Sequence, residues 1–301
     1  MPRRILVGTD FSTRSDRALR RATLLARQGA AELVLAHVID DDRPTRLRQA
    51  EEREAAVLLG ELAETTRTTD GVACGYEMAS GEPFEQIPRL AGDAQADLIV
   101  MGPHRRQALR DIFIGTTVER TIRRTRHPLL MANAVPAGAY RHVLLTCDLS
   151  DSSIGWLQAA LAFSFLKDAE TTVLHVFDSL AKSAMVRSAL QPDDLQHQLD
   201  EETVLAKTKL REFLARAGVA SHRQEVGHRT PTEAVTIHDY AEKQGMDLIV
   251  MGTQQRTGAA KYILGSVAEE VLRIAPTDVL VFPVGPFEDE ETSVAARQPA
   301  R

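Results

Sequence analysis

The sequence predicts two tandem α/β domains, each with a doubly wound sheet of five parallel strands, and three observations support this fold class. The hexapeptide Asp-Leu-Ile-Val-Met-Gly occupies residues 97–102 and returns unchanged at residues 247–252, which indicates that one domain occurs twice. Strand-like and helix-like segments alternate in both halves. The strand-like segments are apolar throughout, which is typical of a parallel sheet covered by helices on both faces. Because crossover connections are right-handed, a doubly wound sheet is the simplest topology.

The first half begins with a short apolar strand and an amphipathic helix. The strand is predicted at residues 5–7, and the helix at residues 15–28 carries apolar side chains along one face. Ser12 or Ser15 suits the N-cap of this helix, and Gly29 suits its C-cap. The remaining strands of this half are predicted at residues 32–38, 72–78, 98–101 and 128–134, and the remaining helices at residues 44–66, 83–95 and 116–126.

The second half repeats this alternation after a short linker. Pro136 and Gly138 mark the linker, so we expect one domain at residues 1–136 and its repeat at residues 139–286. Residues 287–301 are polar and are predicted to form a tail. Strands are predicted at residues 141–147, 171–177, 219–226, 247–251 and 278–284, and helices at residues 151–167, 192–217, 231–244 and 266–275.

Three further landmarks recur in the same order in both halves. An Asp-x-Ser motif follows the first strand, beginning at Asp10 and again at Asp148, and a His-Val pair ends the second strand at residues 37–38 and 175–176. A glycine and a hydroxyl residue come thirteen residues after the hexapeptide's glycine in each half. These landmarks follow the carboxyl ends of strands, where doubly wound sheets bind their ligands. The sequence therefore predicts one ligand site in each half.

Composition excludes several other classes of protein. The 301 residues are 44% hydrophobic and 26% charged, with a formal net charge of -6, which argues against nucleic-acid binding. No apolar run is long enough to cross a membrane. The two cysteines, Cys74 and Cys147, lie far apart and form no metal-binding or disulfide pattern, so a reducing cytoplasm is expected. Cys147 is interpreted as a small residue at a strand end. The histidines show no spacing typical of a metal site.

The loop after the hexapeptide predicts an anion site. Glycine lets a ligand approach the backbone closely, and the N–H groups at the start of the following helix can bind phosphate. The loop also carries basic residues that would complement phosphate charge, namely His104, Arg105, Arg106 and Arg110 in the first half and Arg256 and Lys261 in the second. The alternative is a solvated surface loop with an ordinary helix cap. The Asp-x-Ser motif has a similar alternative, in which it only caps the first helix.

The arrangement resembles the universal stress protein family in its tandem form. Nucleotide-binding members carry Gly, two residues, Gly, nine residues, Gly and then Ser or Thr. Gly102 with residues 115–116, and Gly252 with residues 265–266, match the outer elements of this motif. The middle glycine is replaced in both halves, by Arg105 and by Gln255.

The resemblance implies a flavodoxin-like domain that binds ATP or a related adenine nucleotide, with or without Mg²⁺, in some members and no nucleotide in others. By position, the aspartates would face adenine or ribose, the valines would meet adenine through their backbone, and the glycine-bearing loops would hold ribose and phosphates. The implied binding residues are Thr9, Asp10, Val38, Met101, Gly102, His104, Arg105, Gly115, Thr116, Thr117, Cys147, Asp148, Val176, Met251, Gly252, Gln254, Gln255, Gly265, Ser266 and Val267. Residues 256–258, Arg-Thr-Gly, resemble binding members more closely, so the second half is the favoured binder.

The resemblance favours a stress-response regulator that binds nucleotide in at least one domain. The last strand of each half is expected to meet its counterpart in an internal pseudo-dimer, and a homodimer is a further arrangement that the resemblance allows. The alternative is a nucleotide-free scaffold that acts through protein partners. An enzyme is disfavoured because the glycine-rich motifs of dehydrogenases and P-loop ATPases are absent. Under these hypotheses, Gly102→Asp should abolish nucleotide binding and leave a scaffold unaffected.

Overall fold

The structure is a computed structural model that describes residues 2–42, 44–103, 116–179, 192–220, 222–253 and 264–283. Its strands are β1 (Arg4–Gly8), β2 (Glu32–Ile39), β3 (Cys74–Ser80), β4 (Leu98–Met101), β5 (Leu129–Met131), β6 (His142–Thr146), β7 (Glu170–Phe177), β8 (Arg223–His228), β9 (Leu248–Gly252) and β10 (Asp278–Phe282). Its helices are α1 (Thr13–Gly29), α2 (Thr45–Thr68), α3 (Pro83–Asp93), α5 (Thr117–Ile122), α6 (Asp151–Leu161), the 3₁₀ helix η1 (Ser164–Leu166), α8 (Pro192–Arg216), α9 (Glu233–Lys243) and α10 (Ser266–Ile274).

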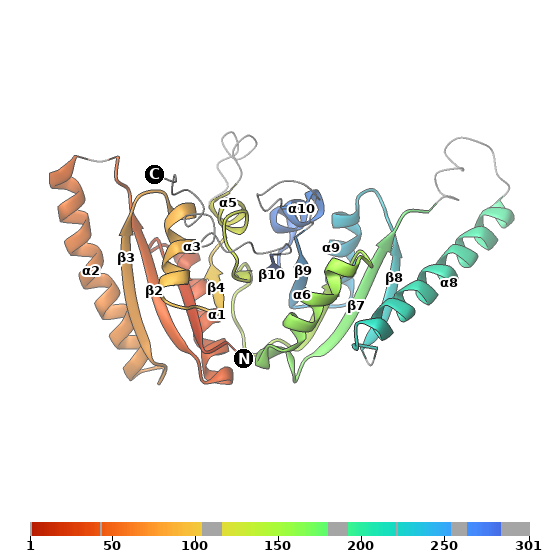
Figure 1. Cartoon of the computed structure of the whole chain (residues 1–301), viewed down its shortest axis with the longest axis horizontal. Coiled ribbons are helices and arrows are strands. Elements are labelled where there is room, and N and C mark those ends of the chain that lie inside the picture. Colours follow the sequence, from red (N-terminus) through yellow and green to blue (C-terminus); the bar gives the residue numbers. More distant parts are fainter. Residues whose placement is uncertain are drawn as a thin grey trace, which may run out of the picture.

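The strands form one ten-stranded sheet in the order β3-β2-β1-β4-β5-β10-β9-β6-β7-β8 (Figure 1). We call β1 to β5 with their helices the first half, and β6 to β10 with theirs the second half. Neighbouring strands within each half are parallel, and the halves join through antiparallel pairing of β5 with β10. Leu130 and Leu280 face each other across this junction. The predicted doubly wound halves and their internal pseudo-dimer are confirmed.

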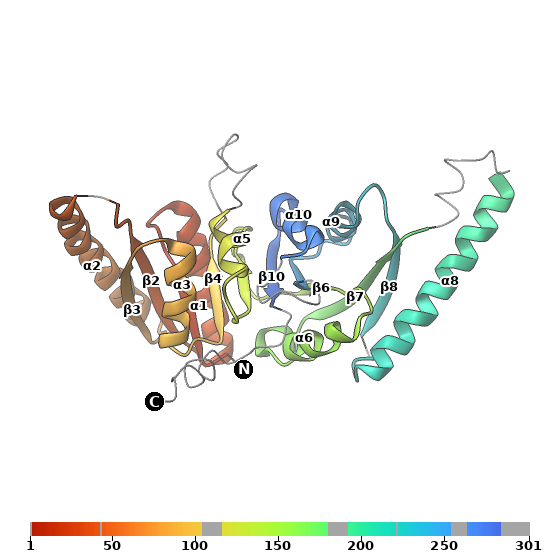
Figure 2. The ribbon, with the colours of Figure 1, turned by 45° about the horizontal axis from the view of Figure 1, so that its top comes forward.

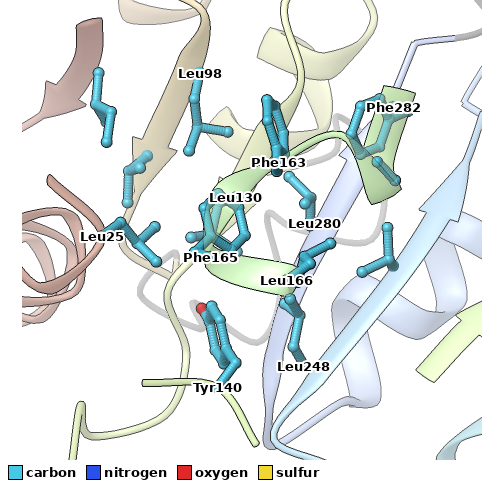
Figure 3. Packing of buried hydrophobic residues seen from close by; sticks show 14 of the residues in the cluster. Leu25, Leu98, Leu130, Tyr140, Phe163, Phe165, Leu166, Leu248, Leu280 and Phe282 are labelled. Carbon is cyan, nitrogen blue, oxygen red and sulfur yellow. The ribbon is translucent and has the colours of Figure 1, made fainter. Parts of the chain in front are cut away.

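Helices cover both faces of the sheet, as the continuously apolar strands require. Ile5 and Val7 of β1 face a core that includes residues of α1, α2, α6 and α8, whereas Leu6 faces a core that includes residues of α3, α5, α9 and α10 (Figure 2). Both cores continue across the β5–β10 junction. Figure 3 shows Leu130 and Leu280 beside the aromatic residues that follow α6. Burial of these side chains, at about 25 cal/mol per Å², holds the two halves together.

A buried polar network fixes the linker between the halves on one side of the junction. Asp278, at the start of β10, is fully buried. Its Oδ2 accepts hydrogen bonds from Nε of Arg21 at 2.8 Å and from the hydroxyl of Tyr140 at 2.6 Å. Its other oxygen accepts the backbone N–H groups of Asn133 and Ala134, each at 2.8 Å. The paired and hydrogen-bonded carboxylate therefore connects α1, the linker and β10.

Local differences from the predicted elements have identifiable causes. The predicted helix at residues 151–167 ends at Leu161, and a 3₁₀ turn follows in which Phe165 and Leu166 are buried near α1. The strand predicted to start at residue 219 starts at Arg223, because residue 219 belongs to the connection that follows the end of α8 at Arg216. Ala30, with φ 51°, takes the C-cap position predicted for Gly29. No helix within the described ranges has the length and apolarity needed to span a membrane.

Candidate binding pockets

Each half carries a pocket at the carboxyl ends of its central strands, where the strand order reverses. The first-half pocket measures about 300 Å³ and the second-half pocket about 90 Å³. The first-half pocket is lined by Gly8, Thr9, Asp10, Arg14, Ser15, Ala36, His37, Val38, Pro83, Ile87, Met101, Gly102, Pro103, Thr117 and Val118. The second-half pocket is lined by Thr146, Cys147, Asp148, Ser152, Ser153, Trp156, Glu233, Met251, Gly252, Thr253, Gly265, Val267 and Ala268.

The aspartate of each Asp-x-Ser motif organises the turn between the first strand and the first helix of its half. Asp10 accepts the backbone N–H of Ser12 at 3.1 Å and its hydroxyl at 2.5 Å. Ser12 is the N-cap of α1 and accepts the N–H of Ser15. Burial acts to raise the pKa of Asp10, but hydrogen bonds from Ser12 and Ser15 and the charge of Arg14 outweigh it and lower the pKa. The carboxylate is therefore ionised at neutral pH and partly used by the turn.

Asp148 plays the corresponding role in the second half. It accepts the backbone N–H of Ser150 at 3.0 Å and the hydroxyls of Ser150 at 2.6 Å and Ser153 at 2.7 Å. Burial acts to raise its pKa, and these hydrogen bonds lower it overall. The residue after each aspartate, Phe11 or Leu149, adopts positive φ of 58° or 60°. The same strained backbone conformation occurs in both halves, so the two turns, each beginning with its aspartate, have the same structure.

Two histidines join the second strand of each half to the same turn. Nδ1 of His37 lies 2.9 Å from the carbonyl oxygen of Thr9, and Nδ1 of His175 lies 2.9 Å from that of Cys147. A carbonyl only accepts, so Nδ1 carries the proton in both rings. Burial lowers the pKa of His175, which keeps that ring neutral. Both histidines therefore tie the second strand of their half to the turn that follows the first strand.

Gly102 is required by packing. A β carbon on this residue would lie 2.5 Å from the carbonyl oxygen of Arg14 and 3.0 Å from the backbone nitrogen of Ser15. Backbone atoms at the start of α1 cannot move aside as a flexible side chain can. The Gly102→Asp substitution would therefore disturb this turn in a nucleotide binder and in a scaffold alike, so it does not discriminate between the two hypotheses.

The two helices that follow the glycine-bearing loops are capped differently. At α5, the hydroxyl of Thr116 accepts the N–H of Glu119 at 3.2 Å, and the Glu119 carboxylate accepts the N–H of Thr116 at 2.8 Å, which is a complete capping box. At α10, Gly265 is the N-cap and has no side-chain hydrogen bond. Glu269 instead forms an ion pair of 2.9 Å with Arg123 of the first half. The capping box places a carboxylate where the sequence predicts a phosphate.

The pockets differ at three corresponding positions that affect their size and charge. Where the first half has Ala18 on α1, the second half has Trp156 on α6, and Trp156 lines the smaller pocket. Arg14 corresponds to Ser152, and Pro83 corresponds to Glu233. Burial raises the pKa of Glu233, and the charges of Asp148 and Asp178 raise it further. The second-half pocket is thus narrower and more acidic.

Several residues predicted from the sequence meet in these pockets. Thr9, Asp10, Val38, Met101, Gly102 and Thr117 line the first, and Cys147, Asp148, Met251, Gly252, Gly265 and Val267 line the second. Thr116, Val176 and Ser266 are not among the lining residues. His104, Arg105, Gly115, Gln254 and Gln255 lie outside the described residues, as do the loop's other basic residues and the tail.

Arg14, Pro83, Trp156 and Glu233 are among the wall residues that sequence reasoning missed. Arg14 and Trp156 lie in the first two turns of α1 and α6, directly after the Asp-x-Ser motif, and Pro83 and Glu233 begin α3 and α9. Helix starts that follow strand ends border the same sheet edge, so their positions carried a usable signal. Burial raises the pKa of the Cys147 thiol to about 12, which makes it a poor nucleophile. The described ranges contain no His, Cys, Asp and Glu cluster suited to a metal ion.

Comparison with known proteins identifies both halves with one family. The model of the universal stress protein family matches residues 1–133 and again residues 139–283. A universal stress protein of Methanocaldococcus jannaschii is 31% identical over 142 residues, covering 47% of this chain and 81% of the relative. A putative universal stress protein of Staphylococcus haemolyticus is 28% identical over 142 residues, covering 47% of this chain and 84% of the relative. Each relative therefore corresponds to about half of this chain.

Solved structures show the same fold over the whole chain. The crystal structure of a universal stress protein from Archaeoglobus fulgidus aligns with a TM-score of 0.68 at 20% identity, covering 95% of this chain and 97% of that one. A putative universal stress protein from Pseudomonas aeruginosa aligns with a TM-score of 0.64 at 20% identity, with 94% of each chain covered. Similarity at this level of identity supports the tandem arrangement of the fold.

Proposed function

The chain belongs to the universal stress protein family, and on that basis we propose that it is a regulatory protein that binds an adenine nucleotide, ATP or AMP, in its first half. The observation that carries the proposal is the pocket of about 300 Å³ at the carboxyl ends of β1 and β4. This volume is at the lower end of the range for small-molecule sites, and the place is where doubly wound sheets bind ligands.

The pocket walls suit an adenine ring. Ala36, Val38, Ile87, Met101 and Val118 provide apolar surface, and the apolar faces of a base bury well against such side chains. Val38 lies near the end of β2, beyond Ala36, where the pairing of β2 with β1 stops. These features support a flat, largely apolar ligand with a polar edge.

The polar side of the same pocket suits a ribose and a phosphate. Asp10 is ionised and its side chain is 64% exposed, so Oδ2, which the Ser12 hydrogen bonds do not use, can accept hydrogen bonds from hydroxyl groups. Nη2 of Arg14 lies 3.7 Å from Oδ2 of Asp10, which leaves the guanidinium free to bind an anion with its other N–H groups. Among the described residues that line this pocket, Arg14 is the one arginine or lysine.

The geometry favours the first half over the second, contrary to the expectation from residues 256–258. A pocket of about 90 Å³ corresponds to roughly three water molecules, too few for a nucleotide. Asp148 and Glu233 both line it, and two carboxylates repel a phosphate. The loop comparison could not reveal this, because Trp156 and Glu233 come from other parts of the chain.

The scaffold hypothesis keeps one specific observation in its favour. The capping box of Thr116 and Glu119 already satisfies two backbone donors at the start of α5 and adds negative charge there. A phosphate at this position would have to displace the Glu119 carboxylate or bind elsewhere. The nucleotide proposal therefore places the anion near Arg14.

The test is calorimetric titration of the full chain, freed of co-purified ligand, with Mg-ATP, ADP and AMP. We expect one site per chain. Two sites would contradict the assignment to the first half alone. If no nucleotide produces heat at several temperatures, and none protects the chain against thermal unfolding, the scaffold function replaces the nucleotide function.

A further inference from the structure

The helix α8 leaves two large apolar side chains in solvent. It stands at the outer end of the second half and packs on β7 and β8 (Figure 2). Leu210 and Phe213 bury the inner face against the sheet. On the outer face, Val204 is 65% exposed and its neighbour Leu205 is 55% exposed. Two large apolar side chains at consecutive positions form a small apolar patch that a partner could cover.

Val204 belongs to a stripe that runs along the helix. His197, Glu201, Val204 and Thr208 are spaced by four, three and four residues, so they lie on one side of an α-helix. These residues line one open surface together with Gln196, Asp200 and Leu205. We call these seven residues the α8 stripe. Val204 and Leu205 are its two large apolar members.

Charges along α8 are arranged with opposite signs at its two ends. Asp200 and Glu201 are exposed on the N-terminal side of Val204 and Leu205. The C-terminal side exposes three bases, Lys207, Lys209 and Arg211, and one acid, Glu212. A parallel partner helix of the same sequence would set acid against acid and base against base. An antiparallel copy would set each acidic end against a basic end, so the stripe is complementary to itself in one orientation only.

We propose that two copies of the chain associate through the α8 stripe, with their α8 helices antiparallel about a two-fold axis between Val204 and Leu205. Such an isologous contact buries the same patch on both chains and closes after two subunits. The axis brings Asp200 of each chain near Lys207 of the other, and His197 near Glu212. The apolar pairs meet at the centre. The proposal does not depend on nucleotide binding, because α8 and the first-half pocket lie in different halves of the chain.

Sedimentation of the intact chain tests the proposal. We expect a reversible dimer of twice the 33.1 kDa chain mass, with Val204→Glu weakening dimerisation at least about tenfold because it buries an unpaired carboxylate at the centre. The matched control is Val57→Glu on α2, the corresponding helix of the first half, where Val57 is 57% exposed. This control makes the same chemical change on a comparable surface and should leave the dimer intact. Far-ultraviolet circular dichroism should show both variants folded.

A charge exchange tests the antiparallel orientation. Asp200→Lys should weaken the dimer, and adding Lys207→Asp to the same chain should restore it, because each lysine then again meets an aspartate of the other copy. A chain that stays monomeric at roughly 1 mM, or a dimer that Val204→Glu leaves unchanged, would overturn the proposal. Failure of the double variant to recover would overturn the antiparallel arrangement.

Discussion

The two halves share a framework and differ in the space it encloses. Asp10 and Asp148 hold equivalent turns, and His37 and His175 donate to equivalent carbonyl oxygens. Yet one pocket measures about 300 Å³ and the other about 90 Å³. The repeated motifs therefore report how strand ends are joined to helices. Whether a ligand fits is decided by wall residues outside the motifs.

The junction between β5 and β10 is a second place where the halves differ. A substitution there should have the largest effect on stability. Arg21 and Asp278 form a buried pair on one side, whereas the corresponding positions are Ala159 and Pro128. We expect Asp278→Ala to lower the free energy of unfolding by about 3–5 kcal/mol, because it leaves Arg21 buried without its partner. Urea unfolding measures this change.

The exposed pair of Asp151 with Arg216 serves as the control for this prediction. Asp151→Ala should change the free energy of unfolding by no more than about 1 kcal/mol, as is usual for solvent-exposed ion pairs. Equal losses in the two variants would mean that the Asp278 network contributes nothing beyond a surface contact.

Exchanging one wall residue should make the first pocket behave as the second. Pro83→Glu introduces the acid that the second half carries at Glu233. Because Pro83 occupies the first turn of α3, where acidic residues are favourable, the fold should tolerate the change. We expect ATP affinity to fall at least about tenfold through repulsion of like charges. Glu233→Gln is the matched change in the other pocket. Calorimetry should show that this variant binds ATP with unaltered affinity and stoichiometry.

Arg14 should account for a smaller part of nucleotide binding. Arg14→Ser, which introduces the residue found at Ser152, should lower the affinity for ATP about tenfold, as expected for loss of a hydrogen bond to a charged group. The affinity for adenosine, which lacks phosphates, should fall far less. Arg20→Ser is the control, since Arg20 lies on the same helix and pairs with Asp16 in solvent. Equal losses for ATP and adenosine would place Arg14 away from the phosphates.

The acids of the second pocket should give the smallest effect, seen in the pH dependence of stability. Burial and neighbouring carboxylates raise the pKa of Glu233 above its unfolded value. The folded chain then binds more protons than the unfolded chain, so this group's contribution to stability falls as pH rises through the raised pKa. Glu233→Gln should remove that fall and raise the melting temperature at neutral pH by less than about 2 °C.

Asp148 should show the opposite sign in the same pocket. Its pKa is lowered in the folded chain, so its contribution is present above the unfolded pKa and is lost as pH falls through the lowered value. Asp148→Asn should therefore destabilise the chain at neutral pH and have little effect in acid. Melting curves of both variants between acid and neutral pH compare the two signs directly.

Much of the fold could be predicted from local patterns. Continuously apolar runs such as residues 98–101 identify buried parallel strands, because this signal acts within a few neighbouring residues. The sequence narrowed the N-cap of the first helix to Ser12 or Ser15, and the structure selects Ser12. Errors arose where distant contacts decide. The helix after Ser150 stops early because Phe165 and Leu166 pack toward α1 of the other half.

The sequence by itself determined the repeat, the doubly wound halves and the residues of the strand-end turns, since these depend on periodicity and on groups close along the chain. Only the tertiary structure decided the size and charge of each pocket, the packing demand at Gly102 and the burial of Asp278. Each of these depends on atoms brought together from segments far apart in the chain. Volume and burial are properties of that assembly, so no local motif encodes them.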